Sequence, residues 1–332
     1  MRRPIRLALL ALTALALAPG TFVRTTPPPL DLTSPVVFKR LRTGSLEVGP
    51  LTLDSAWELT SKHAYFGGWS AMIDRGDNTF LLASDAGRLM VLPRPDQSAR
   101  QPRLMSLVDE ESLDKRRSDA ESLARDDNGT VWLGLEQANA IVRLGPDMRE
   151  ERRVRPPAMR EWETNSGAES MVRLADGRFI VVAEGQNSGG KQEGLLFAAD
   201  PTLGRTPVRF TFRGIDGYRP SDAALLPDGR ILFVLRRIVF EWPPRFGVRL
   251  VVADPKDIRA GGVLQSALLA DIAPPIPTDN FEGATVTVEP NGDWAVWLIS
   301  DDNFFRLQRT LLLKFDWPQK PKSNENDKKR PD

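Results

Sequence analysis

Five segments of the chain share one pattern of hydrophobic and polar positions. Each begins with a short polar or acidic entry, continues as an apolar run, turns, and returns as a second apolar run. The turns are centred on Asp77-Asn78, Asn128-Gly129, Asp176-Gly177, Asp228-Gly229 and Asn291-Gly292. Asn-Gly and Asp-Gly between apolar runs are strong hairpin signals, and the expected turn is type I′, in which both central residues have φ above zero. The pattern therefore predicts five β-hairpins.

The hairpins recur about every 50 residues, and a further apolar run follows most of them. These later runs are Ala140–Leu144, Leu195–Ala199, Arg249–Ala253 and Thr310–Phe315. Three or four antiparallel strands per unit, repeated five times, predict an all-β fold, a β-propeller of five blades. Six blades remain possible if residues 36–48 and neighbouring strands build a degenerate unit. The best helix candidate is the short stretch Asp254–Gly261.

The fifth unit lacks an obvious fourth strand before the chain turns polar at Pro318. The run Leu51–Thr60 is apolar and has no partner within its own part of the sequence. We expect this N-terminal strand to close the last blade, because closure removes the exposed sheet edges of an open ring. Residues 36–317 then form a single propeller domain.

The two ends of the chain have a different composition. Residues 1–18 begin with three arginines, continue as a 12-residue apolar run and end in Ala16-Leu17-Ala18, which predicts a cleaved signal peptide. The apolar run is shorter than the ~20 residues that a membrane-spanning helix needs, although an uncleaved anchor is the alternative. We expect no membrane span after cleavage and a periplasmic or secreted protein. Residues 19–35 form a Pro/Thr-rich tail, and residues 318–332 a disordered polar tail.

Composition narrows the possible chemistry. Lys and Arg number 45 against 44 Asp and Glu, and this balance argues against a nucleic-acid partner. The chain has no Cys and one His, His63, so thiolate and multi-His metal sites are excluded. Catalysis would depend on carboxylates, hydroxyls, Arg or Lys, or a hard metal ion.

Carboxylates recur at the entry to four of the five hairpins. Aligned on the turns, the entry residues are Ser70 (or Trp69), Glu121, Glu169, Asp222 and Glu282. A second set follows the second strand of each hairpin: Asp85, Glu136, Glu184, Asp301 with Asp302, and Arg236 in the fourth unit. Because the first strands of a propeller line its central channel, we expect the entry carboxylates to converge at one mouth of that channel.

Converging carboxylates need a counter-charge. Two like charges ~8 Å apart repel by roughly 1 kcal/mol at an effective dielectric of ~40. Ca²⁺ could bind them, arginines could pair with them, or some could be protonated. Alternatively, each carboxylate holds one blade to the next. We predict Glu121, Glu169, Asp222 and Glu282 as metal ligands and catalytic residues, and the following as substrate-binding residues: Arg117, Arg219, Arg236, Asp301 and Asp302.

Several motifs together resemble the "esterase-like activity of phytase" family. They are Phe66–Met72, Ser118–Ser122, Asn165–Glu169, Arg219–Asp222, Asn280–Gly283, Leu298–Phe304 and Gln308–Thr310. The resemblance covers about residues 38–315. It implies an exported, hydrolase-like propeller that acts on phosphoesters.

Three hypotheses on function follow. The first is a metal-assisted ester or phosphoester hydrolase at the channel mouth, a monomer with Ca²⁺, a small-molecule ester substrate and no organic cofactor. The second is a lactone or carboxylic-ester hydrolase with the same channel-metal geometry. The third is a non-catalytic propeller that binds a ligand or a protein, with a purely structural acidic ring.

Overall fold

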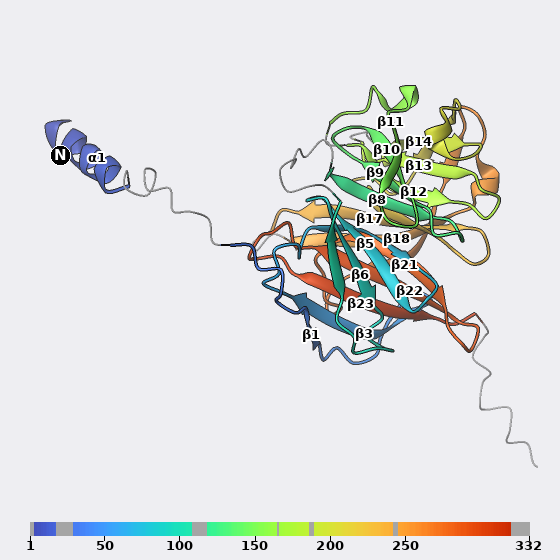
Figure 1. Cartoon of the computed structure of the whole chain (residues 1–332), viewed down its shortest axis with the longest axis horizontal. Helices are drawn as coiled ribbons and strands as arrows, with labels where there is room; N and C mark the ends of the chain where they lie inside the picture. The colour runs from blue at the N-terminus through green and yellow to red at the C-terminus, as the bar shows by residue number, and fades with distance from the viewer. Residues whose placement is uncertain are drawn as a thin grey trace, which may run out of the picture.

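The computed structural model describes residues 3–17, 29–107, 118–164, 166–185, 189–241 and 245–319, and within them it confirms a five-bladed β-propeller (Figure 1). A helix, α1 (Arg3–Leu17), precedes the blades. Among the described residues no helix is both long and apolar enough to cross a membrane.

The first two blades are four-stranded antiparallel sheets in which the strands follow one another in sequence order. Blade 1 consists of β4 (Trp69–Asp74), β5 (Thr79–Ser84), β6 (Arg88–Pro93) and β7 (Arg103–Ser106). Blade 2 consists of β8 (Ala120–Arg125), β9 (Val131–Leu135), β10 (Ala140–Leu144) and β11 (Glu150–Val154). The short helix η2 (Pro157–Met159) leads to blade 3.

Blade 3 gains a fifth strand from the segment that joins the last two strands of blade 4. Blade 3 consists of β12 (Ala168–Arg173), β13 (Phe179–Ala183), β14 (Lys191–Phe197) and β15 (Val208–Arg213), with η3 (Pro201–Leu203) before the last strand. Blade 4 consists of β16 (Arg219–Leu225), β17 (Ile231–Val239), β18 (Arg245–Ala253) and β20 (Ala267–Ile272). Between β18 and β20, the helix η4 (Pro255–Asp257) occupies part of the helix candidate, and β19 (Val263–Gln265) pairs in parallel with β15.

The N-terminal strand closes the last blade, as predicted. Blade 5 consists of β21 (Asn280–Val288), β22 (Trp294–Asp301), β23 (Thr310–Trp317) and β3 (Leu51–Thr60). The strand β3 pairs antiparallel with β23, with Thr310 opposite Leu59, and the blue and red ribbons lie side by side in Figure 1. Residues 36–48 do not form a sixth blade, because β1 (Val37–Arg40) and β2 (Leu46–Val48) both pair with β3.

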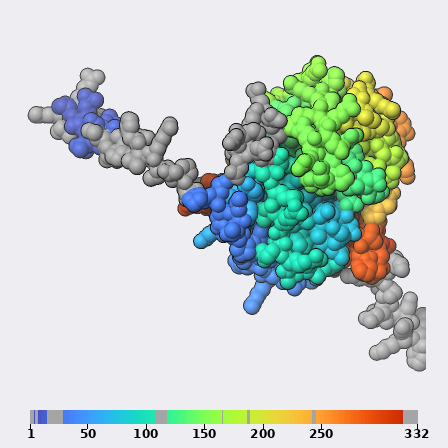
Figure 2. Space-filling model, viewed as in Figure 1, coloured from blue at the N-terminus to red at the C-terminus, as the bar shows by residue number. Residues whose placement is uncertain are grey.

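Five apolar clusters hold the ring together, one between each pair of neighbouring blades. The cluster between blades 5 and 1 joins Trp57 and Trp297 to Trp69 and Phe80. In Figure 2 the blue N-terminal strands lie against the cyan blade 1. Because every blade buries apolar side chains against two neighbours, the ring is closed and the inner strands β4, β8, β12, β16 and β21 surround its axis.

The hairpin turns lie where the sequence predicts them, but their type is different. The type I′ prediction is wrong because φ is positive only at the last residue of each Gly-containing turn, as at Gly177 (85°) and Gly229 (87°). The bonds from Gly177 N to Leu174 O and from Leu174 N to Arg178 O define a three-residue loop. In that loop the Asp176 carboxylate accepts the Arg178 N–H, which stabilises the Asp-Gly turn without a second left-handed residue.

Candidate functional site

Each inner strand carries a β-bulge close to its first residue. The pairing with the second strand skips one residue per blade: Ser70, Glu121, Glu169, Ser221 and Glu282. Bulges re-aim a side chain and are frequent next to active sites. Three of the five re-aimed residues are glutamates from blades 2, 3 and 5.

Two more residues of each blade lie close to the bulged residue. One is two positions before the bulge, and the other is its partner across the hairpin, in the later part of the second strand or just after it. The N–H groups of Asp85, Glu136 and Glu184 bond to the carbonyls of Gly68, Asp119 and Gly167, at 3.1, 3.0 and 3.3 Å. The equivalent pairs are Arg219 with Arg236 in blade 4 and Asn280 with Asp301 in blade 5. One mouth of the channel therefore gathers eight carboxylates, which we call the acidic ring: Asp85, Asp119, Glu121, Glu136, Glu169, Glu184, Glu282 and Asp301.

The carboxylates of blades 2 and 3 approach one another most closely. Ligand oxygens of Asp119, Glu121 and Glu136 all lie within 4.8 Å of one another. The same limit holds for Glu136, Glu169 and Glu184, so Glu136 belongs to both groups. Glu121, Glu169 and Glu184 are at most 9% exposed. Of the four predicted metal ligands, the structure brings Glu121 and Glu169 into these groups and leaves Asp222 and Glu282 outside them.

Arg236 of blade 4 offsets part of this negative charge. One guanidinium nitrogen lies 2.9 Å from Glu282 and 3.4 Å from Glu184, and the other donates to Asn280 Oδ1 at 3.1 Å. Burial alone would lower the pKa of Arg236, but the carboxylates of Glu282, Glu184 and Glu169 outweigh burial and raise it. The Arg236 Nε atom is buried and has no hydrogen-bond acceptor among the described residues.

Burial and mutual repulsion make the acidic ring hard to ionise completely. Burial raises the pKa of Glu121, and the carboxylates of Glu282 and Asp119 raise it further. The pKa of Glu169 is raised in the same way, by burial and then by Glu121. Burial raises the pKa of Glu136 to about 7, although hydrogen bonding with Glu169 opposes the shift. Without a cation, part of the ring is therefore protonated at neutral pH.

Asp222 lies next to the ring but has a different environment. It comes one residue after the bulge, since Ser221 is the residue that the pairing skips in blade 4. Its Oδ1 accepts the Ala223 N–H at 2.8 Å, and its Oδ2 accepts the Ala284 N–H of blade 5 at 2.7 Å. Burial raises the pKa of Asp222, and these backbone donors oppose the rise. Its contacts match the alternative in which a carboxylate joins one blade to the next.

The predicted substrate-binding residues divide into three groups. Arg219 is half exposed and lies 3.5 Å from Glu184, while Arg236 is tied into the ring. Asp301 is buried and accepts the Asn303 N–H, whereas Asp302 binds Gly68 N–H and Phe304 N–H with one oxygen and the Thr310 hydroxyl with the other. Arg117 lies outside the described residues.

A pocket adjoins the ring on the blade 4 side. Its volume is about 300 Å³, and it is lined by Glu184, Gly217, Arg219, Arg236, Arg237, Ile238 and Phe240. Ile238 and Phe240 are 51% and 89% exposed, so the outer wall is apolar while the inner wall carries charge. The pocket gives the acidic ring a neighbouring space for a small molecule with an anionic and an apolar part.

Aligning the five repeats on their turns did not identify Asp119 as a site residue, and it did not show that Glu136 lies between the two carboxylate groups. Asp119 is two residues before Glu121, so the alternation of a β-strand places both side chains on one face. That signal was present in the sequence. The bulge at Ser221 also had a signal, because Ser221, like Glu121 and Glu169, lies seven residues before the first residue of its turn.

The fold and the site define a five-bladed propeller with a carboxylate-lined channel mouth. A family model described as "Phytase-like: Esterase-like activity of phytase" matches residues 64–304, and the chain belongs to this family. The match includes all eight residues of the acidic ring.

Comparisons outside the family give only distant similarities. No curated protein matches the chain. Among solved structures, a PQQ-bound aldose sugar dehydrogenase from Streptomyces coelicolor has 12% identity and a TM-score of 0.44, over 84% of this chain and 98% of that chain. A streptogramin B lyase has 10% identity and a TM-score of 0.38, over 85% of this chain and 98% of that chain. Similarities at this level do not indicate function.

Proposed function

We propose that the acidic ring binds Ca²⁺ and that the adjoining pocket holds an ester or phosphoester for hydrolysis. The observation that carries the proposal is the pair of carboxylate groups that share Glu136. Ca²⁺ binds oxygen ligands at 2.3–2.6 Å, so two ligands of one ion lie no more than about 5 Å apart. Oxygens already within 4.8 Å of one another meet that requirement.

The chemistry of the donor set also fits a hard cation. All eight side chains of the ring are carboxylates, and among the described residues blade 4 supplies two arginines to offset them. Ca²⁺ takes six to eight oxygen ligands and is bound by carboxylates and carbonyls. We assign Asp119, Glu121, Glu136, Glu169 and Glu184 as the residues that would hold it.

Two arginines beside the ring would then contact the substrate together with the bound ion. Bound Ca²⁺ supplies positive charge beside the ester, which polarises a carbonyl or phosphoryl oxygen. Arg236 has a fixed position and lines the pocket, so its positive charge can stabilise an anionic oxygen of the substrate. Arg219 is half exposed and its contact with Glu184 is long, so it can turn toward an anionic group.

Calcium binding and turnover should fail together in two variants. Glu136→Gln and Glu169→Gln each remove one charge and keep the side-chain shape. We expect each to weaken Ca²⁺ binding in titration calorimetry and to reduce hydrolysis of p-nitrophenyl phosphate or p-nitrophenyl acetate by at least tenfold. Glu161→Gln is the matched control, because Glu161 is exposed and lies outside the ring. Full activity of both ring variants, or of the wild type in EDTA, would discard the mechanism.

A carboxylic ester or lactone is the second candidate substrate class. The exposed apolar side chains of Ile238 and Phe240 favour it, because a highly charged phosphoester gains nothing from an apolar wall. A panel of p-nitrophenyl esters, lactones and phosphomonoesters at saturating Ca²⁺ separates the two classes. Calcium binding without turnover of any member would instead support the non-catalytic, ligand-binding propeller.

We further propose that residues 1–18 direct export and are removed. Mass spectrometry of the protein purified from a periplasmic fraction should give a mature N-terminus near residue 19. An intact Met1 on the exported protein would contradict cleavage.

A further inference from the structure

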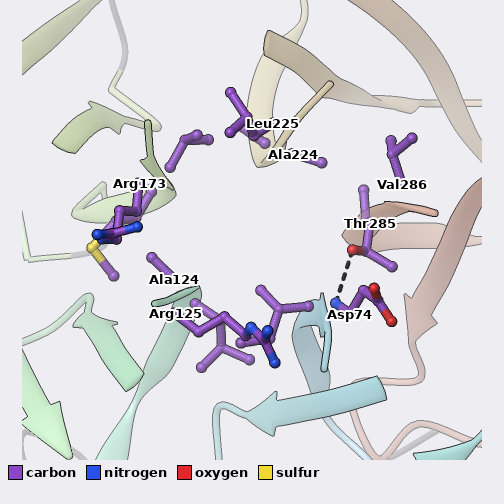
Figure 3. A pocket seen from close by; sticks show the side chains of 14 residues that line it. Asp74, Ala124, Arg125, Arg173, Ala224, Leu225, Thr285 and Val286 are labelled. Carbon is purple, nitrogen blue, oxygen red and sulfur yellow. Dashed lines mark hydrogen bonds between the residues drawn. The ribbon is translucent and has the colours of Figure 1, made fainter. Parts of the chain in front are cut away.

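The channel has a second cavity at the opposite end of the inner strands, and its chemistry differs from that of the acidic ring. It has a volume of about 230 Å³ and is lined by residues 73–74, 123–125, 171–173, 223–225 and 284–286. These are the later residues of β4, β8, β12, β16 and β21, whereas the bulged residues are near the start of the same strands. Figure 3 shows the labelled side chains arranged around the opening.

The position four residues after each bulge decides the charge of this mouth. It is Asp74 in blade 1, Arg125 in blade 2 and Arg173 in blade 3, while blades 4 and 5 place Leu225 and Val286 there. Two neighbouring blades therefore contribute guanidinium groups, and the opposite side of the cavity is apolar. Its net charge is positive, since one carboxylate faces two arginines.

The two arginines have different partners. Arg125 donates to the Arg75 carbonyl, and its charge lowers the pKa of Asp74 against the larger, opposite effect of burial. Arg173 is half-buried, and no hydrogen bond or ion pair within the described part of the chain engages its guanidinium. A guanidinium has five N–H donors, so Arg173 retains its full capacity for a ligand.

A third donor faces the same space. The Thr285 hydroxyl accepts the Asp74 N–H at 2.9 Å, as the dashed line in Figure 3 shows, and keeps its own hydrogen to donate. Ala124, Ala224, Leu225 and Val286 supply apolar surface between the polar groups. A cavity of about 150 Å³ holds benzene, so this larger one has room for a ring-sized group.

We propose that this second cavity binds a small organic oxyanion, a carboxylate or a phosphate ester, with its anionic group on Arg173 and its apolar part against blades 4 and 5. Arginine matches both oxyanions because its planar fork donates two parallel hydrogen bonds. The site is independent of the proposed calcium site, from which it is separated by the buried length of the inner strands.

Calorimetric titration of the full chain with benzoate and with phenyl phosphate tests this site. Both probes are used in EDTA, which removes the cation that the proposed hydrolysis of phenyl phosphate requires, and the tighter one identifies the preferred anionic group. We expect saturable 1:1 binding by the wild type and at least about tenfold weaker binding by Arg173→Gln, because a charge-assisted hydrogen bond is lost. Arg178→Gln is the matched control, since Arg178 is paired with Asp176 on the nearby turn and does not line the cavity.

A second variant separates loss of binding from loss of folding. Ala224→Leu fills part of the cavity and keeps both arginines, and it should also weaken binding. Calcium affinity serves as the readout of an intact fold in every variant, or the melting temperature if calcium does not bind. The proposal is overturned if neither probe binds the wild type saturably, if Arg173→Gln binds as well as the wild type, or if Arg178→Gln loses as much affinity.

Discussion

Replacing Arg236 by Gln should expose how much of the acidic ring depends on one cation. The substitution keeps a polar side chain but removes the charge that contacts Glu282 at 2.9 Å and Glu184 at 3.4 Å. Both carboxylates are about nine-tenths buried, so neither can regain full hydration. Removing one partner of a buried ion pair costs about 3–5 kcal/mol, because the remaining charge is left uncompensated. A domain of this size loses about 2 °C of melting temperature per kcal/mol.

Thermal unfolding in EDTA at pH 7.5 measures this cost. We expect Arg236→Gln to lower the melting temperature by roughly 6–10 °C. The deficit should shrink at pH 5.5, where the ring carboxylates bind protons, and again in excess Ca²⁺. Arg237→Gln is the matched control, because that exposed neighbour lies over the Tyr218 ring at 4.8 Å and outside the acidic ring.

The reasoning would be refuted by two results. A melting temperature equal to that of the wild type in EDTA would mean that Arg236 does not offset the charge of the ring. An equal deficit at pH 5.5 and 7.5 would mean that the loss comes from packing and not from unpaired carboxylates.

Three further predictions concern stability. In EDTA the melting temperature should fall as pH rises from 5.5 to 8. The pKa of Glu136 is about 7 in the folded state against an ordinary value of 4.5, so in that window the folded state holds more protons than the unfolded state, and raising the pH costs about 2 kcal/mol of stability after allowance for partial exposure. A melting temperature that does not change with pH would contradict this. Arg94→Met should cost about 1–3 kcal/mol in urea unfolding at pH 7, since Arg94 binds Asp96 and Glu289 between the first and last blades while Lys314 remains paired with both carboxylates; an unchanged midpoint would show that the Arg94 pairs do not stabilise the propeller. Trp57→Ala should cost about 3–5 kcal/mol of unfolding free energy, because the indole ring of Trp57 in the closing strand β3 stacks on Trp297, with ring centroids 6.0 Å apart. An unfolding curve equal to that of the wild type would argue against closure by this strand.

The sequence predicted the architecture well because the signals for it are repeated. Each blade has a turn with a fixed composition between two apolar runs, so five weak signals support one another. The closing strand, Leu51–Thr60, was found by elimination, since it was the apolar run left without a partner. The turn type was predicted wrongly, because Asp-Gly is compatible with a two-residue and a three-residue loop.

The site was predicted in part, and the reason lies in the bulges. Counting seven residues back from the first residue of the turn gives Glu121 and Glu169, whereas Glu282 lies nine residues before Asn291 in the longer hairpin of blade 5. In blade 4 the count of seven selects Ser221, which is the bulged residue, whereas the prediction took the neighbouring carboxylate Asp222. The importance of Glu136 could not be read from the sequence either, because it depends on the distance between blades 2 and 3.

Direct measurement of calcium binding tests the central claim. Titration calorimetry of the EDTA-treated, dialysed protein at pH 7.5 should show saturable Ca²⁺ uptake that is lost in Glu136→Gln and kept in Glu161→Gln. Saturable uptake with those two outcomes would support the site shared between blades 2 and 3. Absence of uptake by the wild type would show that the acidic ring is neutralised by protons and arginine alone, and equal uptake by Glu136→Gln would show that calcium binds without the shared carboxylate.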